Sequence, residues 1–98
     1  SGGENISSIE IENVLFKHKD IIDAAVVAKP DEKWGEVPCA FVTLKKNSTL
    51  KAKEITQFCR NNMASYKIPK NIIFGKIDKT PTGKTQKYLL RRKVNLID

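Results

Sequence analysis

The sequence predicts a single small α+β domain in which helices pack against a three-stranded sheet, mixed or antiparallel. Three observations lead to this class. Apolar residues recur at helical spacing in two separate stretches, and short β-branched runs lie between and after them. The length of 98 residues suffices for one modest core. Helices that are segregated against a small sheet define the α+β class.

The first helix is expected from about residue 8 to 18. Ser7 and Glu10 have the spacing of a capping box, in which each residue bonds the other's backbone N–H. His18 would then lie in the last turn, where a cation suits the helix dipole. The inward face consists of Ile11, Val14 and Leu15.

Two β-branched runs, residues 21–28 and 38–44, predict two strands joined by a loop with Trp34 and Gly35. We expect the Trp34 ring to pack on the domain edge. A second long helix is expected over about 51–64, with an inward face of Ile55, Phe58, Cys59 and Met63.

The last part of the chain predicts a third strand and a short helix. Residues 71–77 read as the strand, and residues 86–94 suit a terminal helix with Leu89 and Leu90 inward. The sequence shows no internal repeat and no low-complexity linker.

The two cysteines are predicted to be reduced core thiols. Cys39 lies in an apolar stretch and Cys59 at an inward helix position, without the CxxC spacing of a metal or redox site. We therefore expect a reducing compartment, the cytoplasm, and no metal site. No run approaches the ~18 apolar residues of a membrane span, so we expect a soluble protein without stable membrane insertion.

Charge divides the chain into two unlike halves. The net charge is +7, with six Lys/Arg against eight Asp/Glu in residues 1–49 and twelve against three in residues 50–98. The second half is therefore suited to an anionic partner: a nucleotide, coenzyme A, nucleic acid or an anionic membrane.

A turn near the C-terminal end presents one lysine. Pro81 presets the turn, and Gly83 removes a side chain that would keep a phosphorylated ligand from the backbone. Lys84 then offers a mobile point charge suited to phosphate. By itself the pattern is also that of an ordinary surface turn.

Four segments carry a family resemblance, in order and spacing, across essentially the whole chain. They are Gly2-Gly3-Glu4-Asn5-Ile6, residues 34–42, residues 66–70 and residues 82–87. The chain resembles the small, mobile C-terminal domain of adenylate-forming enzymes: acyl-CoA synthetases, adenylation domains of peptide synthetases, and luciferases. Its start at Ser1, on the glycine loop, suggests a piece of a longer protein whose N-terminal domain and hinge precede it.

The resemblance implies roles for several residues. Lys84 matches the catalytic lysine, an electrostatic anchor for the reacting carboxylate and the α-phosphate of ATP. After adenylation the domain rotates and presents Gly2 and Gly3, which would line the channel of the coenzyme A pantetheine arm, with Glu4 and Asn5 beside them. ATP, coenzyme A and Mg²⁺ would be bound mainly through the N-terminal domain, so the isolated domain should be inactive.

Other cations have weaker implied roles. Arg60 occupies a position where acyl-CoA synthetases can place an arginine against the phosphates of coenzyme A, although an arginine on a helix is more often a surface residue. Lys67, Lys70 and Lys87 could add to the field or simply increase solubility. Asp78 replaces a proline common in relatives, which puts recognition of Lys84 by a lysine acetyltransferase in doubt.

The resemblance favours an acyl-CoA synthetase of the fatty or medium-chain type, acting on a small-molecule carboxylic acid. An enzyme that transfers its adenylate to a carrier protein is the alternative within the family. Outside it, a basic nucleic-acid or membrane module would explain the charge but not the glycine loop, and Tyr88 is the only aromatic near the basic tail for base stacking. A purely structural role predicts that no single lysine matters.

Overall fold

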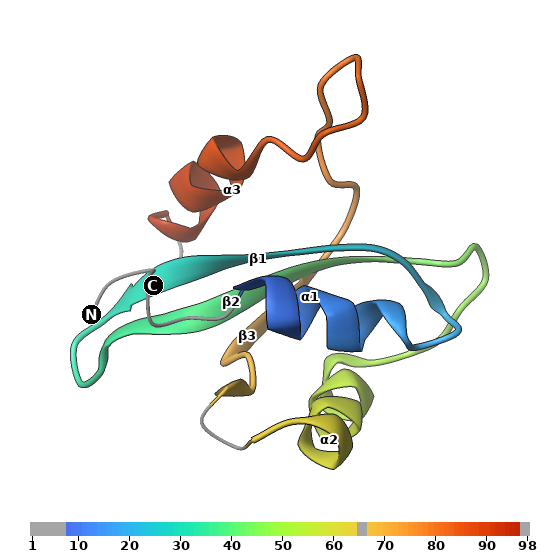
Figure 1. Ribbon diagram of the computed structural model, residues 1–98, viewed down its shortest axis with the longest axis horizontal. Helices are drawn as coiled ribbons and strands as arrows, with labels where there is room; N and C mark the ends of the chain where they lie inside the picture. Colours follow the sequence, from blue (N-terminus) through green and yellow to red (C-terminus); the bar gives the residue numbers. More distant parts are fainter. Residues whose placement is uncertain (1–7, 65–66, 97–98) are drawn as a thin grey trace.

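The computed structural model describes residues 8–64 and 67–96, which form three layers around one sheet (Figure 1). Helices α1 and α2 cover one face of the sheet, and α3 covers the other. The elements, in chain order, are α1 (Ser8–Phe16), β1 (Ile21–Asp31), β2 (Gly35–Leu44), α2 (Ala52–Asn62), β3 (Asn71–Phe74) and α3 (Lys87–Val94). The α+β class, the mixed three-stranded sheet and the short third helix are confirmed.

The sheet has the strand order β1-β2-β3. β1 and β2 form an antiparallel hairpin, whereas β2 and β3 are parallel, with Cys39 opposite Asn71 and Val42 opposite Phe74. The parallel pair requires a crossover between its strands, and α2 lies in that connection. β2 is therefore the central strand, and the chain leaves β3 toward the opposite face.

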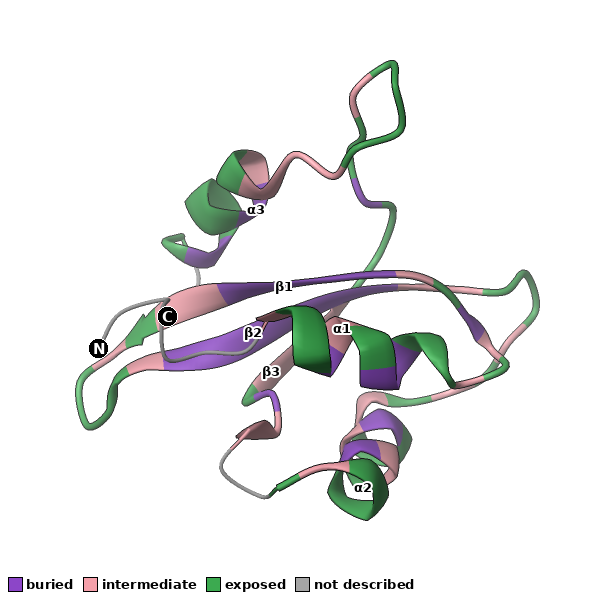
Figure 2. Cartoon of the chain, viewed as in Figure 1, coloured by how far each residue is buried: buried purple, intermediate pink, exposed green. Residues whose placement is uncertain are grey.

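Alternate residues of the two long strands enter different cores. Ala24 and Val26 face α1 and α2, whereas Ala25 and Val27 face α3. β1 and β2 are consequently buried on both sides, as Figure 2 shows, and this explains why their sequences read as unbroken apolar runs. We call the two sides the α1/α2 face and the α3 face.

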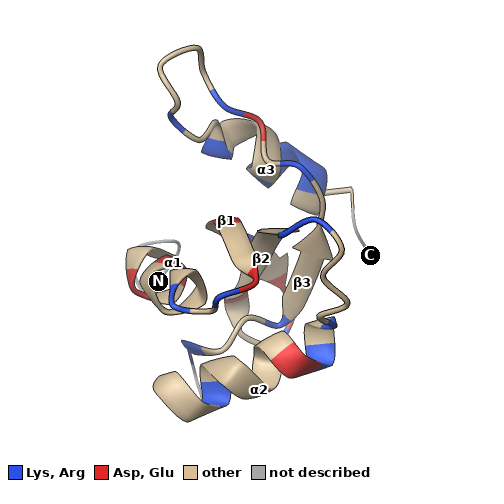
Figure 3. Ribbon diagram, turned by 90° about the vertical axis from the view of Figure 1, so that its right-hand side faces the viewer, with Lys and Arg blue, Asp and Glu red and all other residues tan. Residues whose placement is uncertain are grey.

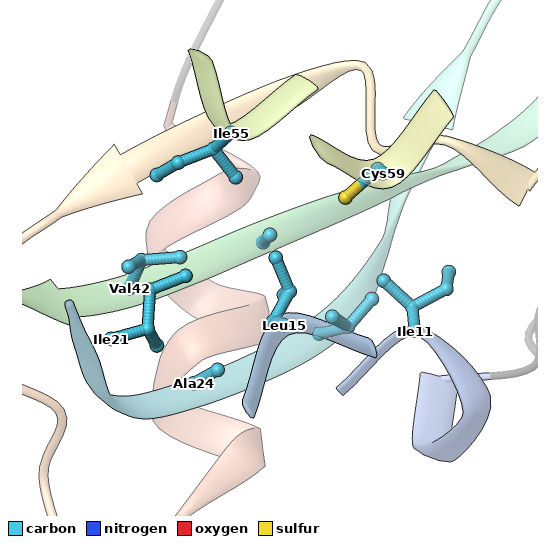
Figure 4. Close-up of a cluster of buried hydrophobic side chains, with 9 residues drawn as sticks. Ile11, Leu15, Ile21, Ala24, Val42, Ile55 and Cys59 are labelled. Carbon is cyan, nitrogen blue, oxygen red and sulfur yellow. The ribbon is translucent and has the colours of Figure 1, made fainter. Parts of the chain in front are cut away.

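The α1/α2 face is a tight cluster in which side chains of both helices meet the sheet (Figure 4). The register shifts between Ile21 and Asp23, which leaves Ile22 as the extra residue of a bulge. Because of this shift, Ile21 and Ala24 both enter this cluster, although residues three positions apart would face opposite sides of a regular strand. Asp23, by contrast, falls in the alternation of Ala25 and Val27.

Several predicted bounds were wrong. The third strand ends at Phe74, because Gly75 with φ +150° breaks the strand; Ile77 is still buried, but as irregular chain on the α3 face. The first two strands extend further, to a hairpin turn of residues 32–34. In that turn the Asp31 carboxylate accepts backbone hydrogen bonds from Lys33 and Trp34 at 3.1 and 2.9 Å.

Two aromatic residues differ from expectation. α1 ends at Phe16, so His18 lies beyond it, where its Nδ1 accepts a hydrogen bond from the Asp20 N–H and its ring meets Phe58 edge-on at 4.9 Å. Trp34 does not pack on the domain edge: it is 63% exposed, with the Lys33 ammonium 5.0 Å from its ring centre. Ser7, the expected capping residue, lies outside the described residues.

The cysteines are core residues, as predicted, but on opposite faces. Cys59 is buried in the α1/α2 face and Cys39 in the α3 face, so the sheet separates their thiols. Burial raises the pKa of each thiol to about 11. Both thiols are therefore protonated near neutral pH and are poor nucleophiles.

Candidate functional site

The Lys84 loop (residues 80–84) is a short hairpin that projects beyond the body of the domain, at the top of Figure 1. Its two sides are paired by two backbone hydrogen bonds. Thr80 donates to the Lys84 carbonyl at 2.8 Å and Gln86 donates to the Asp78 carbonyl at 3.1 Å, which makes Lys79 and Thr85 an antiparallel bridge. The loop is thus a defined structure and not an irregular connection.

The turn at the tip follows from three residues of the sequence. The Gly83 N–H donates to the Thr80 carbonyl at 2.8 Å, which closes a four-residue turn with Pro81 at its second position. Thr82 has no positive φ, whereas Gly83 has φ +88°, so this is a type I turn followed by a left-handed glycine. The Thr80 hydroxyl also accepts the Lys84 N–H at 3.1 Å.

Gly83 is needed for its backbone conformation. A Cβ added there would meet no atom of the described chain within 4 Å, so crowding inside the domain does not exclude a side chain. The backbone angle φ of +88° disfavours a side chain there, because L residues seldom adopt this angle without strain. The open space also means that the backbone at Gly83 is accessible to another molecule.

Lys84 is exposed, and its ammonium has no hydrogen-bond or ion-pair partner within residues 8–64 and 67–96. This distinguishes it from Lys79 and Lys87 on either side of the loop, whose ammonium groups form ion pairs. A charge that the domain's described part leaves unneutralised is available for an anion from outside.

Ion pairs hold both ends of the loop to α1 and β1. Lys79 Nζ lies 2.9 Å from Asp23 Oδ2 and donates to Thr85 Oγ1 at 3.2 Å. Lys87 Nζ, at the start of α3, lies 2.7 Å from Oε2 of Glu12 on α1. That same oxygen accepts the backbone N–H of Val26 at 2.8 Å, which fixes the carboxylate against β1.

The α3 side of the domain carries a concentration of positive charge, visible in Figure 3. Arg91, Arg92 and Lys93 are exposed in the last turn of α3, and the Lys93 ammonium is 3.8 Å from Asp78. Beside α3 lies a shallow hollow lined by Glu36 and Arg91, together with Ala28, Pro30 and Asn95. Glu36 Oε1 is buried, and no described residue forms a hydrogen bond with it.

Arg60, the predicted site residue that the structure describes outside the loop, does not lie beside Lys84. Arg60 lies in the last turn of α2, exposed, on the side of the sheet opposite to the Lys84 loop in both Figure 1 and Figure 3. Lys67 pairs with Glu10 at 2.8 Å, and Lys70 is exposed. Gly2, Gly3, Glu4 and Asn5 lie outside the described residues.

Sequence reasoning missed the residues that support the loop. Asp23 and Glu12 are more than 50 residues from their lysine partners, and nothing in the local sequence links them. The local signal was limited to the presence of a lysine on each side of the turn, Lys79 before it and Lys87 after it. Within the described residues no group of three or more His, Cys, Asp or Glu could hold a metal ion, and no helix is long and apolar enough to cross a membrane.

Comparison with known families and sequences gives one consistent result. The model of the AMP-binding enzyme C-terminal domain matches residues 10–84. A 2-methylpropanoate–CoA ligase of Humulus lupulus is 55% identical over 94 residues, which cover 93% of this chain and 17% of that protein. A peroxisomal acetate/butyrate–CoA ligase of Arabidopsis thaliana is 51% identical over 98 residues, covering 95% and 17%.

Solved structures agree. A fatty acyl CoA synthetase of Mycobacterium tuberculosis superposes with a TM-score of 0.85 at 40% identity, covering 95% of this chain and 18% of that one. An amide bond synthetase of Marinactinospora thermotolerans gives a TM-score of 0.84 at 30% identity, covering 90% and 18%. The chain thus spans less than a fifth of the length of the proteins that it matches.

Proposed function

Because this chain belongs to the AMP-binding enzyme C-terminal domain family, we propose that it is the mobile C-terminal domain of an ATP-dependent acyl-CoA synthetase. The complete enzyme would convert a carboxylic acid, ATP and coenzyme A to acyl-CoA, AMP and diphosphate. An N-terminal domain of the same protein would be its partner and would bind most of the ATP and the acid.

The observation that carries this proposal is the unpartnered Lys84 ammonium on a structured, projecting loop. In the first half-reaction a carboxylate oxygen attacks the α-phosphorus of ATP, and the bond to diphosphate breaks. Negative charge on the phosphoryl oxygens must be stabilised as this happens. Lys84 would supply a positive charge there, and the left-handed Gly83 would leave its backbone open to the phosphate.

Coenzyme A would use a different part of the domain. Arg60 on α2 and the Lys84 loop lie on opposite sides of the sheet, so one orientation of the domain would not bring both to the same reacting atoms. A rotation between half-reactions is consistent with this arrangement. Gly2 and Gly3 would line the pantetheine channel, with Glu4 and Asn5 flanking it, and the guanidinium of Arg60 would contact the coenzyme's phosphates.

Mg²⁺ would accompany ATP as its usual counter-ion. The Lys84 loop offers a cation and backbone groups, which suit phosphate oxygens and not a metal ion. We therefore propose that the N-terminal domain holds the Mg²⁺–ATP complex and that Lys84 approaches it from the outside.

The substrate is proposed from the named relatives. They act, by their names, on 2-methylpropanoate, acetate and butyrate, so we propose a short aliphatic acid as the first candidate. Some of these relatives are named peroxisomal, so the expected cytoplasmic location competes with the peroxisome. The two buried thiols support a reducing compartment in either case.

The test is acid-dependent ATP–diphosphate exchange by the full-length protein, with short, medium and long acids. Lys84→Ala should lower exchange by at least 100-fold, because the charge acts on the transition state. Lys46→Ala removes an exposed lysine from the turn after β2 and should leave exchange unchanged. Equal exchange in wild type and Lys84→Ala would refute the assignment of Lys84.

A carrier protein as acceptor is the alternative within the family, and one structural neighbour is named an amide bond synthetase and not a CoA ligase. Arg60→Ala tests coenzyme A as the acceptor. If coenzyme A is the acceptor, its KM should rise while exchange stays unchanged. An unchanged KM for coenzyme A would remove Arg60 from the proposed site.

A further inference from the structure

The Lys84 loop is held to the domain by charge and not by apolar packing. Its residues 81–84 are exposed, and the nearest buried side chains along the chain are Ile77 before it and Leu90 after it. Hydrogen bonds within the hairpin define its internal shape but not its direction relative to the sheet. The short ion pairs that can set this direction are those of Lys79 and Lys87, beside a longer contact of 3.8 Å between Lys93 and Asp78.

We propose that the Lys79–Asp23 ion pair is a positioning device that fixes the direction of Lys84 for the adenylation half-reaction. This inference rests on the proposed role of Lys84. Asp23 and Lys79 themselves need not touch ATP or the acid; they act through the loop.

The geometry at Lys79 supports this role. Its ammonium lies 2.9 Å from Asp23 Oδ2 and 3.1 Å from Asp23 Oδ1, and it also donates to Thr85 Oγ1 at 3.2 Å. Because Lys79 and Thr85 face each other across the hairpin, one ammonium joins both sides of the loop to the same carboxylate. The contact therefore resists both opening and rotation of the loop.

The carboxylate is itself fixed on the sheet. Asp23 Oδ1 accepts the Ala24 N–H at 3.0 Å, and the adjacent bulge places Asp23 in the alternation of residues that face α3. Without the extra residue Ile22, strict alternation along β1 would turn Ile21 away from the α1/α2 face, where it is now buried. The bulge thus lets β1 supply an apolar residue to one face and a carboxylate to the other.

The size of the expected effects separates positioning from stability. Lys79 and Asp23 are 35% and 21% exposed, and ion pairs at this level contribute about 1 kcal/mol or less to folding. Displacing a reacting group by about 1 Å, in contrast, can cost roughly 100-fold in rate. Loss of the pair should therefore lower the adenylation rate far more than it lowers stability.

The second ion pair explains why the effect is a displacement and not a loss of the loop. Lys87 remains bound to Glu12, which β1 holds through the Val26 N–H, so the C-terminal end of the loop stays attached. When the Lys79 contact is removed, the loop can pivot about this end. Lys84 would then sample several directions instead of one.

The test is Asp23→Asn in the full-length protein, because this change keeps the Lys79 charge. ATP–diphosphate exchange should fall by about 10-fold or more, with KM for ATP changed less than kcat. Thioester formation from supplied acyl-adenylate and coenzyme A should stay within about twofold of wild type, since the lysine acts in the first half-reaction. Tm should change by only a few degrees, and Asp23→Glu should restore part of the exchange.

Two further variants make the result specific. Glu10→Gln weakens the 2.8 Å pair with Lys67, an ion pair on the α1/α2 face of the domain, and should leave exchange within twofold. The double variant Asp23→Asn with Lys79→Met should lose no more than the larger single loss, because both changes remove one interaction. Losses that multiply would instead show that Asp23 and Lys79 act independently, which would overturn positioning by their ion pair.

The outcomes distinguish this inference from the proposed function. If Lys84→Ala abolishes exchange and Asp23→Asn leaves it unchanged, positioning by the ion pair is wrong and the role of Lys84 stands. A parallel fall of both half-reactions in Asp23→Asn would indicate general damage and also overturn positioning. If Lys84→Ala itself has no effect, both proposals fail together.

Discussion

The two faces of the sheet are built by different means. On the α1/α2 face, nine buried residues from two helices and two strands form one cluster. On the α3 face the cluster has seven buried residues, two of which belong to the eight-residue helix itself, and the chain that reaches this helix first forms the projecting Lys84 loop. The same sheet therefore carries a mainly apolar layer on one side and a charged arm on the other.

This difference separates stability from presentation. Apolar burial is nondirectional and contributes most of the free energy of folding, so it suits the α1/α2 face. If Lys84 meets a second domain, as we propose, its ammonium group has to stay in solvent, where apolar packing is not available to hold it. Ion pairs at the base of the loop can fix the direction of the loop without exposing apolar side chains to solvent.

The largest expected effect comes from emptying each core in turn. Leu15→Ala on the α1/α2 face and Leu90→Ala on the α3 face each remove a fully buried side chain and should each cost about 2–5 kcal/mol in the free energy of unfolding. Urea denaturation of the 98-residue chain measures both. Leu90→Ala should also lower ATP–diphosphate exchange per folded molecule, because α3 directly follows the loop.

Ile55→Ala on α2, which also removes a fully buried side chain, is the matched control for that exchange measurement. Leu15 is not suitable, because it lies on α1 with Glu12, which holds Lys87 at the end of the loop. Ile55→Ala destabilises the α1/α2 face without changing a loop anchor, so exchange by the folded fraction of the full-length protein should stay unchanged. Equal losses of exchange in Ile55→Ala and Leu90→Ala would mean that the two faces do not divide their tasks as we infer.

The next effect, roughly 1–2 kcal/mol, tests two glycines in the same conformation. Gly35 has φ +82° and Gly83 has φ +88°, and neither has an atom within 4 Å of an added Cβ. Gly35→Ala and Gly83→Ala should therefore show similar strain in thermal unfolding. Only Gly83→Ala should lower exchange, because only that turn presents Lys84. If both variants lose exchange equally, the loss in Gly83→Ala comes from reduced stability and not from the presentation of Lys84.

The parts that the sequence predicts correctly are those with a local signal. Helical spacing located α1 and α2, and the β-branched runs located β1 and β2, because burial of an element leaves a periodic pattern in its own residues. The Pro-Thr-Gly-Lys turn was also locally readable. The third strand was predicted to reach residue 77, which was wrong. Ile77 is as buried as a strand residue, but Gly75 has already ended the strand.

The parts that were missed depend on contacts distant in sequence. Asp23 pairs with Lys79, which is 56 positions away in the chain. The orientation of Asp23 depends on a bulge that the sequence pattern did not predict. Trp34 was expected to pack because isolated aromatic rings usually do, but the turn made by Asp31 directs the chain away from the core. The glycine loop at residues 2–5 remains a prediction.

The smallest expected effect uses the buried thiols to compare the two faces at high pH. Burial raises the pKa of Cys39 and Cys59 from 9.0 to about 11, so the unfolded chain loses these protons first as pH rises. The stabilising contribution is therefore complete below pH 9 and is lost between about pH 9 and 11. At pH 9.5 the loss should amount to about 1 kcal/mol per thiol.

Urea denaturation at pH 7 and 9.5 measures this loss, with Cys39→Ala and Cys59→Ala as references for the α3 and α1/α2 faces. Between pH 7 and 9.5 each variant should lose less stability than wild type does. The difference is the contribution of the thiol that the variant lacks, which we call the share of that thiol. If the α3 face opens before the rest of the domain, the Cys39 share will be the smaller, because its thiol already ionises in the native ensemble. Equal shares would show instead that both faces unfold as one cooperative unit, in which case the ion pairs alone distinguish the loop from the core.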